Sequence, residues 1–97
     1  MYPDSPPVRP LEPLLADASV TAIHIREDGI HYGQAGVLRT SEIRFESDAQ
    51  RRQIVNAIVR AGGAVLSADH PVADCILTDG TRVHAQYQPL SISLYKA

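Results

Sequence analysis

The sequence predicts an α+β domain in which helices pack on one face of an antiparallel or mixed sheet. Short stretches of alternating apolar and polar residues recur along the chain, and Asp-Gly or Gly-rich turns separate several of them, as is typical of a meander of strands. The stretch between Ser47 and Gly62 instead repeats its apolar residues at helical spacing. With 97 residues, 44% of them hydrophobic, the chain is large enough for one core but not for two.

The N-terminal residues divide into a proline-rich segment and a short helix. Residues 1–10 hold four of the seven prolines, which remove backbone donors and restrict the residues before them to extended shapes. We therefore expect a flexible segment there and a single domain over residues 11–97. Residues 11–17 predict a helix, with Pro13 acceptable because it falls in the first turn. Its expected buried side chains are Leu11, Leu14 and Leu15.

Three strands are predicted next, joined by tight turns. Residues 20–26 alternate in polarity, and Asp28-Gly29 predicts a reversal into a second strand at residues 30–32, because Gly accepts positive φ without steric cost. Residues 33–36 predict another turn, and residues 37–45 a third strand. One face of the first strand is expected to carry Thr21, Ile23 and Ile25.

The long helix has recognisable start and stop signals. Ser47 is a good N-cap, and Gln50 three residues later completes a capping box. Gly62-Gly63 predicts the C-terminus, where a residue often adopts the left-handed conformation. The expected buried stripe is Ile54, Val55, Ile58 and Val59. The expected solvated side chains are Arg51, Arg52, Gln53, Asn56 and Arg60.

A second hairpin and a last strand complete the domain. Residues 72–78 and 81–87 are predicted to pair antiparallel across a two-residue Asp79-Gly80 turn. Residues 90–96 form the last strand, with Pro89 acceptable at its start. One face of the hairpin is expected to be apolar, with Ala73, Cys75, Leu77, Val83, Ala85 and Tyr87, and the other mixed, with Asp74, Ile76, Thr78, Arg82, His84 and Gln86.

Composition argues against several classes of function. The formal net charge of −2 leaves no basic surplus for nucleic-acid phosphates. No apolar run approaches the roughly 20 residues that cross a bilayer, and the first residues lack the basic and apolar parts of a signal peptide, so we expect a cytoplasmic protein. Cys75 is the single cysteine, which excludes an internal disulfide and favours a small core residue.

The candidate catalytic and metal-binding residues have simpler structural interpretations. Neutral histidine is a common metal ligand, but the spacing of the four histidines matches no ligand pattern, so no metal site is predicted. Nothing orients a third group near Cys75, so a thiol nucleophile is not predicted either. Asp79 is explained by its turn and Asp74 by a strand end, rather than by acid–base catalysis. The histidines are His24, His31, His70 and His84.

Several segments together resemble the N-terminal domain of the type II/type IV secretion-superfamily ATPases, in particular the tight-adherence (Flp) pilus-assembly and conjugation-type branch. Residues 11–23 read LEPLLADASVTAI where the family has L-x-P-L-L-x-D-P-x-V-T-E-I. Residues 38–45 also match, and residues 74–83 contain L-T-D-G-T-R-V where the family has L-P-D-G-S-R-V. Residues 89–90 match the family's P-P-L. The resemblance spans residues 10–97.

The resemblance implies a PAS-like α+β domain, which in the family precedes a RecA-like motor domain and helps to form a hexameric ring closing over nucleotide. The chain has no G-x-x-x-x-G-K-[ST] motif, so it lacks the phosphate loop of the motor. We therefore expect neither enzyme activity nor a bound cofactor. Ile76 and Tyr95 replace two arginines that the family resemblance places towards the nucleotide, and Arg82 alone keeps its charge. The family loop before the last strand is shortened here to Ser91.

These observations favour a non-catalytic interaction domain that assists assembly or regulation of a bacterial secretion or pilus apparatus. Its partners would be proteins of that apparatus, including an ATPase motor domain, and would hold it at the inner membrane. Two alternatives stay open: an excised N-terminal domain of a full-length secretion ATPase, and a PAS-like small-ligand sensor, although 5% aromatic residues give little to line a cavity. We expect a monomer or weak oligomer, in which either residues 20–25 or residues 91–95 form an unprotected sheet edge.

Overall fold

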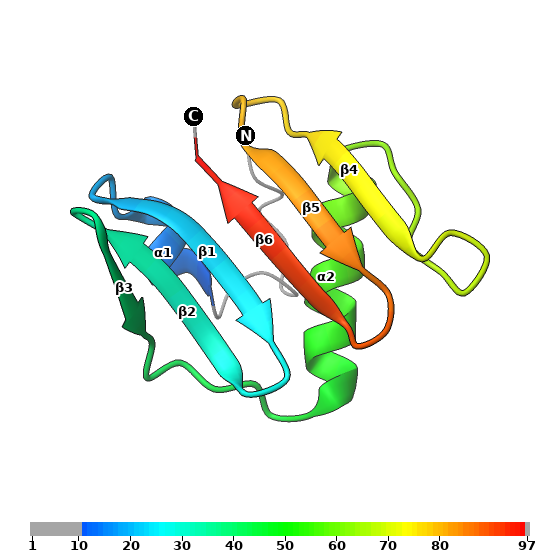
Figure 1. Ribbon diagram of the computed structural model, residues 1–97, viewed down its shortest axis with the longest axis horizontal. Coiled ribbons are helices and arrows are strands. Elements are labelled where there is room, and N and C mark those ends of the chain that lie inside the picture. Colours follow the sequence, from blue (N-terminus) through cyan, green and yellow to red (C-terminus); the bar gives the residue numbers. More distant parts are fainter. Residues whose placement is uncertain (1–10, 97) are drawn as a thin grey trace.

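A computed structural model describes residues 11–96 as two helices and one six-stranded sheet (Figure 1). The expectations for residues 1–10 lie outside the described part. The strand order is β3-β2-β1-β6-β5-β4, and every neighbouring pair is antiparallel. The predicted α+β class is confirmed. The elements are α1 (Glu12–Ala16), β1 (Val20–Arg26), β2 (Gly29–Gln34), β3 (Val37–Thr40), α2 (Asp48–Ala61), β4 (Val72–Ile76), β5 (Arg82–Gln86) and β6 (Ser91–Tyr95).

The centre of the sheet is a pairing between the first and the last strands. β1 and β6 lie side by side, with Ile23 opposite Leu94 and Ile25 opposite Ile92. One or the other of these strands was expected to be a sheet edge, and that prediction is wrong, because the edges are β3 and β4. The reason is burial, since all four of these side chains are at most 1% exposed and a central position covers them best.

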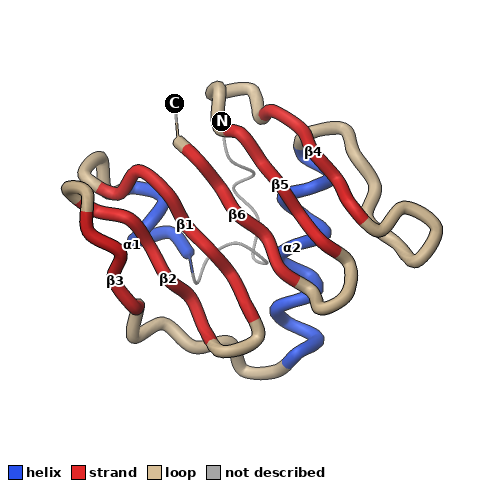
Figure 2. The backbone as a smooth tube through the Cα atoms, viewed as in Figure 1, coloured by secondary structure: helices blue, strands red, loops and turns tan. Residues whose placement is uncertain are grey.

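Both helices cover one face of the sheet, and no helix of residues 11–96 covers the other (Figures 1 and 2). Alternate residues of the strands point towards the helices and form one core with the buried stripe of α2. Among the described residues, neither helix has the length and apolar character needed to cross a bilayer. The largest fully buried core side chains are Leu11, Ile23, Ile25, Ile30, Ile54, Ile58, Ile92 and Leu94.

Helix α2 begins and ends at the predicted signals. Ser47 Oγ accepts a hydrogen bond from Gln50 N at 3.1 Å, and Gln50 Oε1 accepts one from Glu46 N at 2.6 Å. Gly63, at φ +80°, adopts the left-handed conformation after the last turn. The predicted buried stripe is confirmed. Arg51 was expected to be solvated, but only 12% of its side chain is exposed. Its Nη2 lies 3.7 Å from Asp48 Oδ1.

Helix α1 is short, and the last strand holds it in place. Leu11 and Leu14 are buried and Leu15 is partly buried, as predicted. The ammonium group of Lys96 donates to the carbonyl oxygens of Leu14, Leu15 and Asp17 at 2.7 to 2.9 Å. A lysine at this position therefore satisfies carbonyls that the end of a helix leaves without partners.

Strand β1 contains a bulge that the alternation did not reveal. Val20 pairs with Gln34 and Ala22 with Gly33, so one extra residue, Thr21, lies between two ladder positions. The bulge reverses the facing of the residues before it: Val20 is buried and Thr21 is exposed. The prediction that Thr21 shares a face with Ile23 is wrong for this reason.

The first two turns are each displaced from their predicted positions. Arg26 pairs with Gly29, so the reversal uses Glu27 and Asp28, and Gly29 begins β2 at φ +139°. The next turn consists of Ala35 and Gly36, both at positive φ, because β2 continues through Gln34. Asp-Gly and Gly-rich stretches thus located the reversals correctly but missed their register by about one residue.

Strand β3 is shorter than the predicted strand at residues 37–45. It ends at Thr40, and every one of its four residues is exposed. Ser41 N still donates to Ile30 O at 2.8 Å, but Ser41 Oγ then accepts from Ile43 N and turns the chain away from the sheet. The remaining residues form the connection to α2.

The hairpin of β4 and β5 is confirmed with a three-residue loop in place of the predicted two-residue turn. Leu77 N donates to Thr81 O at 2.8 Å, and Gly80 N donates to Leu77 O at 2.9 Å. Gly80 lies at φ +90°, and Asp79 Oδ1 accepts from Thr81 N at 2.9 Å. A turn followed by a left-handed glycine is the usual three-residue hairpin loop. The predicted facing of the two strands holds.

Candidate functional site

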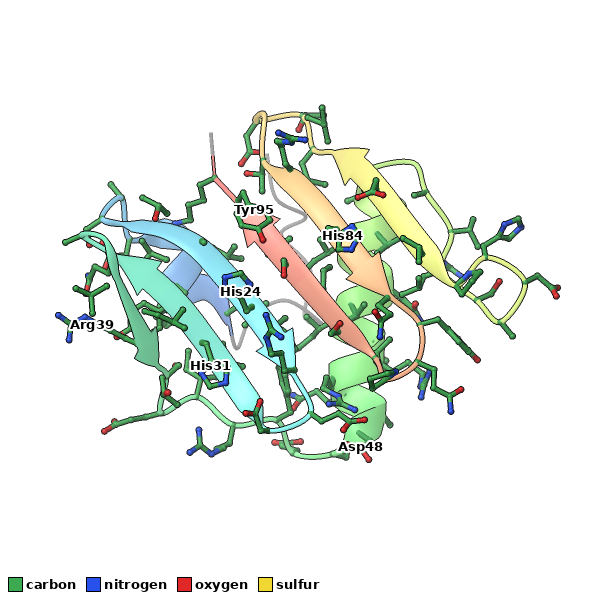
Figure 3. All side chains as sticks on the ribbon, in the orientation of Figure 1. His24, His31, Arg39, Asp48, His84 and Tyr95 are labelled. Atoms are coloured by element: carbon green, nitrogen blue, oxygen red, sulfur yellow. The ribbon has the colours of Figure 1, made fainter. Side chains whose placement is uncertain are left out.

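The candidate site is the sheet face that no helix covers, here named the open face (Figure 3). Its side chains are those that alternate with the core residues of each strand. The open face is exposed, so it does not enclose a substrate away from water. Such a surface is suited to contact with another macromolecule rather than to catalysis in a closed pocket.

A row of polar residues crosses the open face from one edge strand to the other. Each member lies directly opposite the next in the strand pairing, and each comes from a different strand. Three of the four histidines of the chain belong to this row, whereas His70 lies in the loop before β4. In order from β3 to β4, the row is Thr40, His31, His24, Ser93, His84 and Asp74.

Hydrogen bonds connect several members of this polar row. His31 Nδ1 lies 3.2 Å from Thr40 Oγ1, and its Nε2 lies 3.2 Å from Asp28 Oδ1. His24 Nδ1 lies 2.9 Å from Ser93 Oγ. The imidazole nitrogens of His31 are therefore occupied by protein partners. Among residues 11–96, no group of three His, Cys, Asp or Glu side chains is arranged to hold a metal ion.

His24, at the centre of the row, is the most constrained of these imidazoles. Its ring meets the ring of Tyr95 edge to face, with centroids 5.7 Å apart. Partial burial lowers the pKa of His24, and the positive charges of Arg26 and of His31, when protonated, lower it further. The neutral form of His24 is therefore favoured in the folded protein.

At the β4 end of the row, His84 Nδ1 lies 2.6 Å from Asp74 Oδ1. Asp74 was expected at a strand end, but it is the middle residue of β4. Its side chain is 71% exposed and that of His84 is 56% exposed, so both groups remain accessible to a partner. The pair orients the imidazole, but no nucleophile among the described residues is hydrogen-bonded to it.

A second row, beside the first, brings together the three positions that the family resemblance singles out. Ile76 on β4 pairs with Arg82 on β5, and Arg82 pairs with Tyr95 on β6. These residues come from three separate parts of the sequence and share the open face. They also line an open hollow of about 930 Å³ at the β4 end of the sheet.

The other predicted site residues lie elsewhere and have structural roles. Cys75 is half-buried on the helix side, where burial and then the charge of Asp74 raise the pKa of its thiol. Burial alone would raise the pKa of Asp79, but the hydrogen bonds from Thr81 outweigh burial and lower it. Neither residue belongs to the polar row.

Comparison with solved structures shows that this fold is similar to part of a secretion ATPase. The crystal structure of the VirB11 ATPase from the Brucella suis type IV secretion system, in complex with sulphate, superimposes with a TM-score of 0.78. The superposition covers 94% of this chain at 20% sequence identity. The chain spans about 30% of the length of that ATPase, and the two share this fold over that part.

Comparison at the level of sequence was negative. A scan against protein-family models and a search of curated proteins each found no match. At 20% identity the structural likeness shows a common fold. The structure and its similarity to the VirB11 ATPase therefore show the α+β fold. The open face is the part of the domain on which a function can be based.

Proposed function

We propose that this chain is a non-catalytic interaction domain of the PAS-like type found at the N-terminus of secretion and pilus-assembly ATPases. The observation that supports this most strongly is the likeness of nearly the whole chain to a part of the VirB11 ATPase. In this proposal, the part of the ATPase that the chain matches is its N-terminal domain. The chain is then related to the tight-adherence and conjugation-type branch of the family. The role of such a domain would be to assist the assembly or regulation of a secretion apparatus.

The open face fits such a role because its exposed polar and apolar side chains have no helix over them. From Tyr95 the second row continues across the sheet through Ala22 and Gly33 to Leu38 on β3. The large apolar side chains at its two ends are exposed, with Leu38 at 67% and Ile76 at 64%. Surfaces of this kind are common at protein contacts. The partners we propose are cytoplasmic components of the apparatus, including an ATPase motor domain, which would hold the domain at the inner membrane.

The proposal is tested by mixing the chain with a secretion-ATPase motor domain from the same organism, produced without its own N-terminal domain. We expect saturable binding by analytical ultracentrifugation and a change in the rate of ATP hydrolysis by the motor. Tyr95→Ala, on the open face, should weaken binding, whereas Gln53→Ala, on the exposed face of α2, should not. Absence of binding at 100 μM of each protein would overturn the proposal.

Nucleotide binding separates this proposal from the alternative of an excised, nucleotide-contacting domain. Ile76 and Tyr95 lie in one row with Arg82. The family resemblance implies arginines at these two positions, and each missing charge-assisted contact forgoes on the order of 1.5 to 3 kcal/mol. Arg82 alone cannot compensate, because millimolar affinity corresponds to only about 4 kcal/mol. We therefore expect no calorimetric binding of Mg-ATP. Binding tighter than about 100 μM, near 5.5 kcal/mol, would favour the excised-domain alternative.

The arginine positions allow a gain-of-function control. Because Ile76, Arg82 and Tyr95 are neighbours in one row, Ile76→Arg with Tyr95→Arg creates three adjacent guanidinium groups on the open face. A response of this double variant to ATP in the presence of the motor domain would support lost nucleotide contact. An equal response of the unmodified chain would contradict it. The second alternative, a small-ligand sensor, needs an enclosed apolar cavity, and the hollow beside these residues is open to solvent.

A further inference from the structure

The two edges of the sheet differ in what they offer to another strand. Edge strands expose a row of backbone donors and acceptors, and proteins protect them with short length, charged side chains, proline or bulges. β3 has the protection of length, since it contains four residues. β4 has five residues, with no proline and no irregularity in its pairing with β5, and its one charged residue is Asp74.

The hydrogen bonds at the two ends of β4 establish which of its backbone groups point outward. Leu77 N donates to Thr81 O, and Pro71 O accepts from Tyr87 N, so the odd-numbered residues face β5. In an antiparallel ladder this direction alternates along the strand. The N–H and C=O groups of Val72, Asp74 and Ile76 therefore point away from the sheet, and no described residue pairs with them.

The side chains of the same three residues project onto the open face in the order apolar, acidic, apolar. Val72 is 53% and Ile76 is 64% exposed, and the side chain of Asp74 between them is 71% exposed. The open hollow at this end is lined by Gly62 and Cys75 from the helix side and by Ile76 and Arg82 from the open face.

A second copy of the chain is a poor occupant of this edge. The two-fold arrangement that uses all three outward residues is centred on Asp74, and places Val72 opposite Ile76 of the other copy. The same arrangement places Asp74 opposite Asp74, and like charges directly opposite each other destabilise a strand pair. Asp74 thus disfavours self-pairing and favours a strand that carries a positive charge at that position.

We propose that β4 is a docking edge for an extended segment of a partner protein, which adds antiparallel as a seventh strand and alternates apolar, basic, apolar opposite Ile76, Asp74 and Val72. Backbone hydrogen bonds to the three outward residues supply the pairing, and the carboxylate of Asp74 selects the basic side chain. The inference rests on the proposed function, since it names the partner chemistry of an interaction domain. Its test contains no secretion ATPase, so the two proposals fail separately.

The test uses an acetylated and amidated peptide, T-V-T-K-T-V-T, titrated into the isotope-labelled chain and followed by amide NMR shifts and hydrogen exchange. We expect saturable shifts centred on Val72, Asp74 and Ile76, and slower exchange of these three amides. The matched peptide with Glu in place of Lys should bind about fivefold more weakly. Methylation of the backbone nitrogen of the peptide's Lys should abolish binding, since it removes a donor at the centre of the pairing.

Variants of the chain test the same edge from the other side. Ile76→Pro removes an outward N–H and should abolish binding, whereas Leu38→Pro at the β3 edge should leave it unchanged, with circular dichroism confirming that both variants fold. Asp74→Lys should reverse the preference, so that the Glu peptide binds about fivefold more tightly than the Lys peptide. This reversal does not depend on either proline variant.

Four outcomes would overturn the proposal. The first is the absence of amide shifts on β4 at millimolar peptide, and the second is a set of shifts centred on β3. The third is equal affinity for the Lys and Glu peptides, which would remove the role of Asp74. The fourth is protection of the β4 amides that rises with the concentration of the chain alone, which would make the occupant a second copy.

Discussion

The two faces of the sheet are built from alternating residues of the same strands, yet they differ in almost every physical property. On β1, Ile23 and Ile25 are completely buried under the helices, while His24 between them lies on the open face with its Nδ1 2.9 Å from Ser93 Oγ. The helix-covered face is apolar and close-packed, and the open face is polar and solvated. Adjacent residues of a strand therefore have different roles. Those that face the helices stabilise the fold, and those on the open face are available to a partner.

This difference gives a rule for interpreting substitutions. Burial of an apolar side chain contributes about 1.5 to 3 kcal/mol, whereas an exposed ion pair contributes about 0 to 1 kcal/mol. Changes on the helix-covered face should thus be measured as lost stability, and changes on the open face as lost binding. The four predictions below test this contrast.

The largest expected effect is on the helix-covered face, at Ile58. Its side chain is completely buried in the stripe of α2, so Ile58→Asp places an unpaired carboxylate in the core. We expect a loss of about 3 to 5 kcal/mol in the free energy of unfolding, measured by urea denaturation. Gln53→Asp, on the exposed face of the same helix, should change stability by less than about 0.5 kcal/mol. Similar losses for both would contradict the assignment of faces.

The next effect concerns the contact of α2 with the sheet at Gly62. A Cβ atom added there would approach Cys75 Sγ within 2.3 Å and Cys75 Cβ within 2.9 Å. Gly62→Ala should therefore cost about 1 to 3 kcal/mol in the free energy of unfolding. Cys75→Ala in the same chain should recover part of that loss, because it removes the sulfur.

Gly63 is the matched control. A Cβ atom added there would meet no other atom within 4 Å, but the residue lies at φ +80°. Gly63→Ala should cost about 1 kcal/mol through backbone strain, and Cys75→Ala should not relieve it. Equal rescue of both variants by Cys75→Ala would show that crowding is not the cause at Gly62. Thermal unfolding of the three single and two double variants gives the comparison.

A smaller effect is expected from Lys96, which fixes α1 to the end of the sheet. Burial lowers the pKa of Lys96, while the charges of Asp17 and Asp79 oppose that change. Lys96→Met removes the donors to three carbonyls and should cost about 1 to 2 kcal/mol, measured by chemical denaturation. Arg82→Met on the open face should cost less than about 0.5 kcal/mol. A larger loss from the Arg82 variant would reverse the proposed contrast.

The smallest effect is a pH dependence from His24 on the open face. Since the folded pKa is lowered, the folded state binds fewer protons than the unfolded state as pH falls below the ordinary value of 6.5. Stability should therefore fall below that pH and level off below the folded pKa. Partial solvent exposure keeps this contribution to about 0.5 kcal/mol or less. His24→Asn should flatten the unfolding free energy between pH 7.5 and 5, and an unchanged slope would exclude His24 as its source.

The features predicted correctly from the sequence have signals within a few residues of one another. The cap of α2 needs Ser47 and Gln50, its end needs Gly63, and the β4–β5 hairpin needs the turn around Gly80. Small displacements escaped the prediction, because a bulge at Thr21 or a three-residue loop costs little and depends on packing. For the same reason, the end of β3 at Thr40 was not predicted.

The sequence interpretation singled out three residues of the open face but did not predict the surface that they share. Ile76, Arg82 and Tyr95 were identified through family resemblance, and their contiguity appears once β4, β5 and β6 are paired. The polar row of histidines was missed. Its signal was present, since His24, His31 and His84 all fall on outward positions of predicted strands, but the register between strands was needed to align them.

Turn chemistry and periodicity along the chain were enough to predict the class of the domain, its two helices, its hairpins and the buried faces of β4 and β5. Only the tertiary structure decided that β1 and β6 are central and that β3 and β4 are edges. That pairing joins the first and last strands, and no local propensity specifies it. It is decided by the burial of Ile23, Ile25, Ile92 and Leu94 together under the helices.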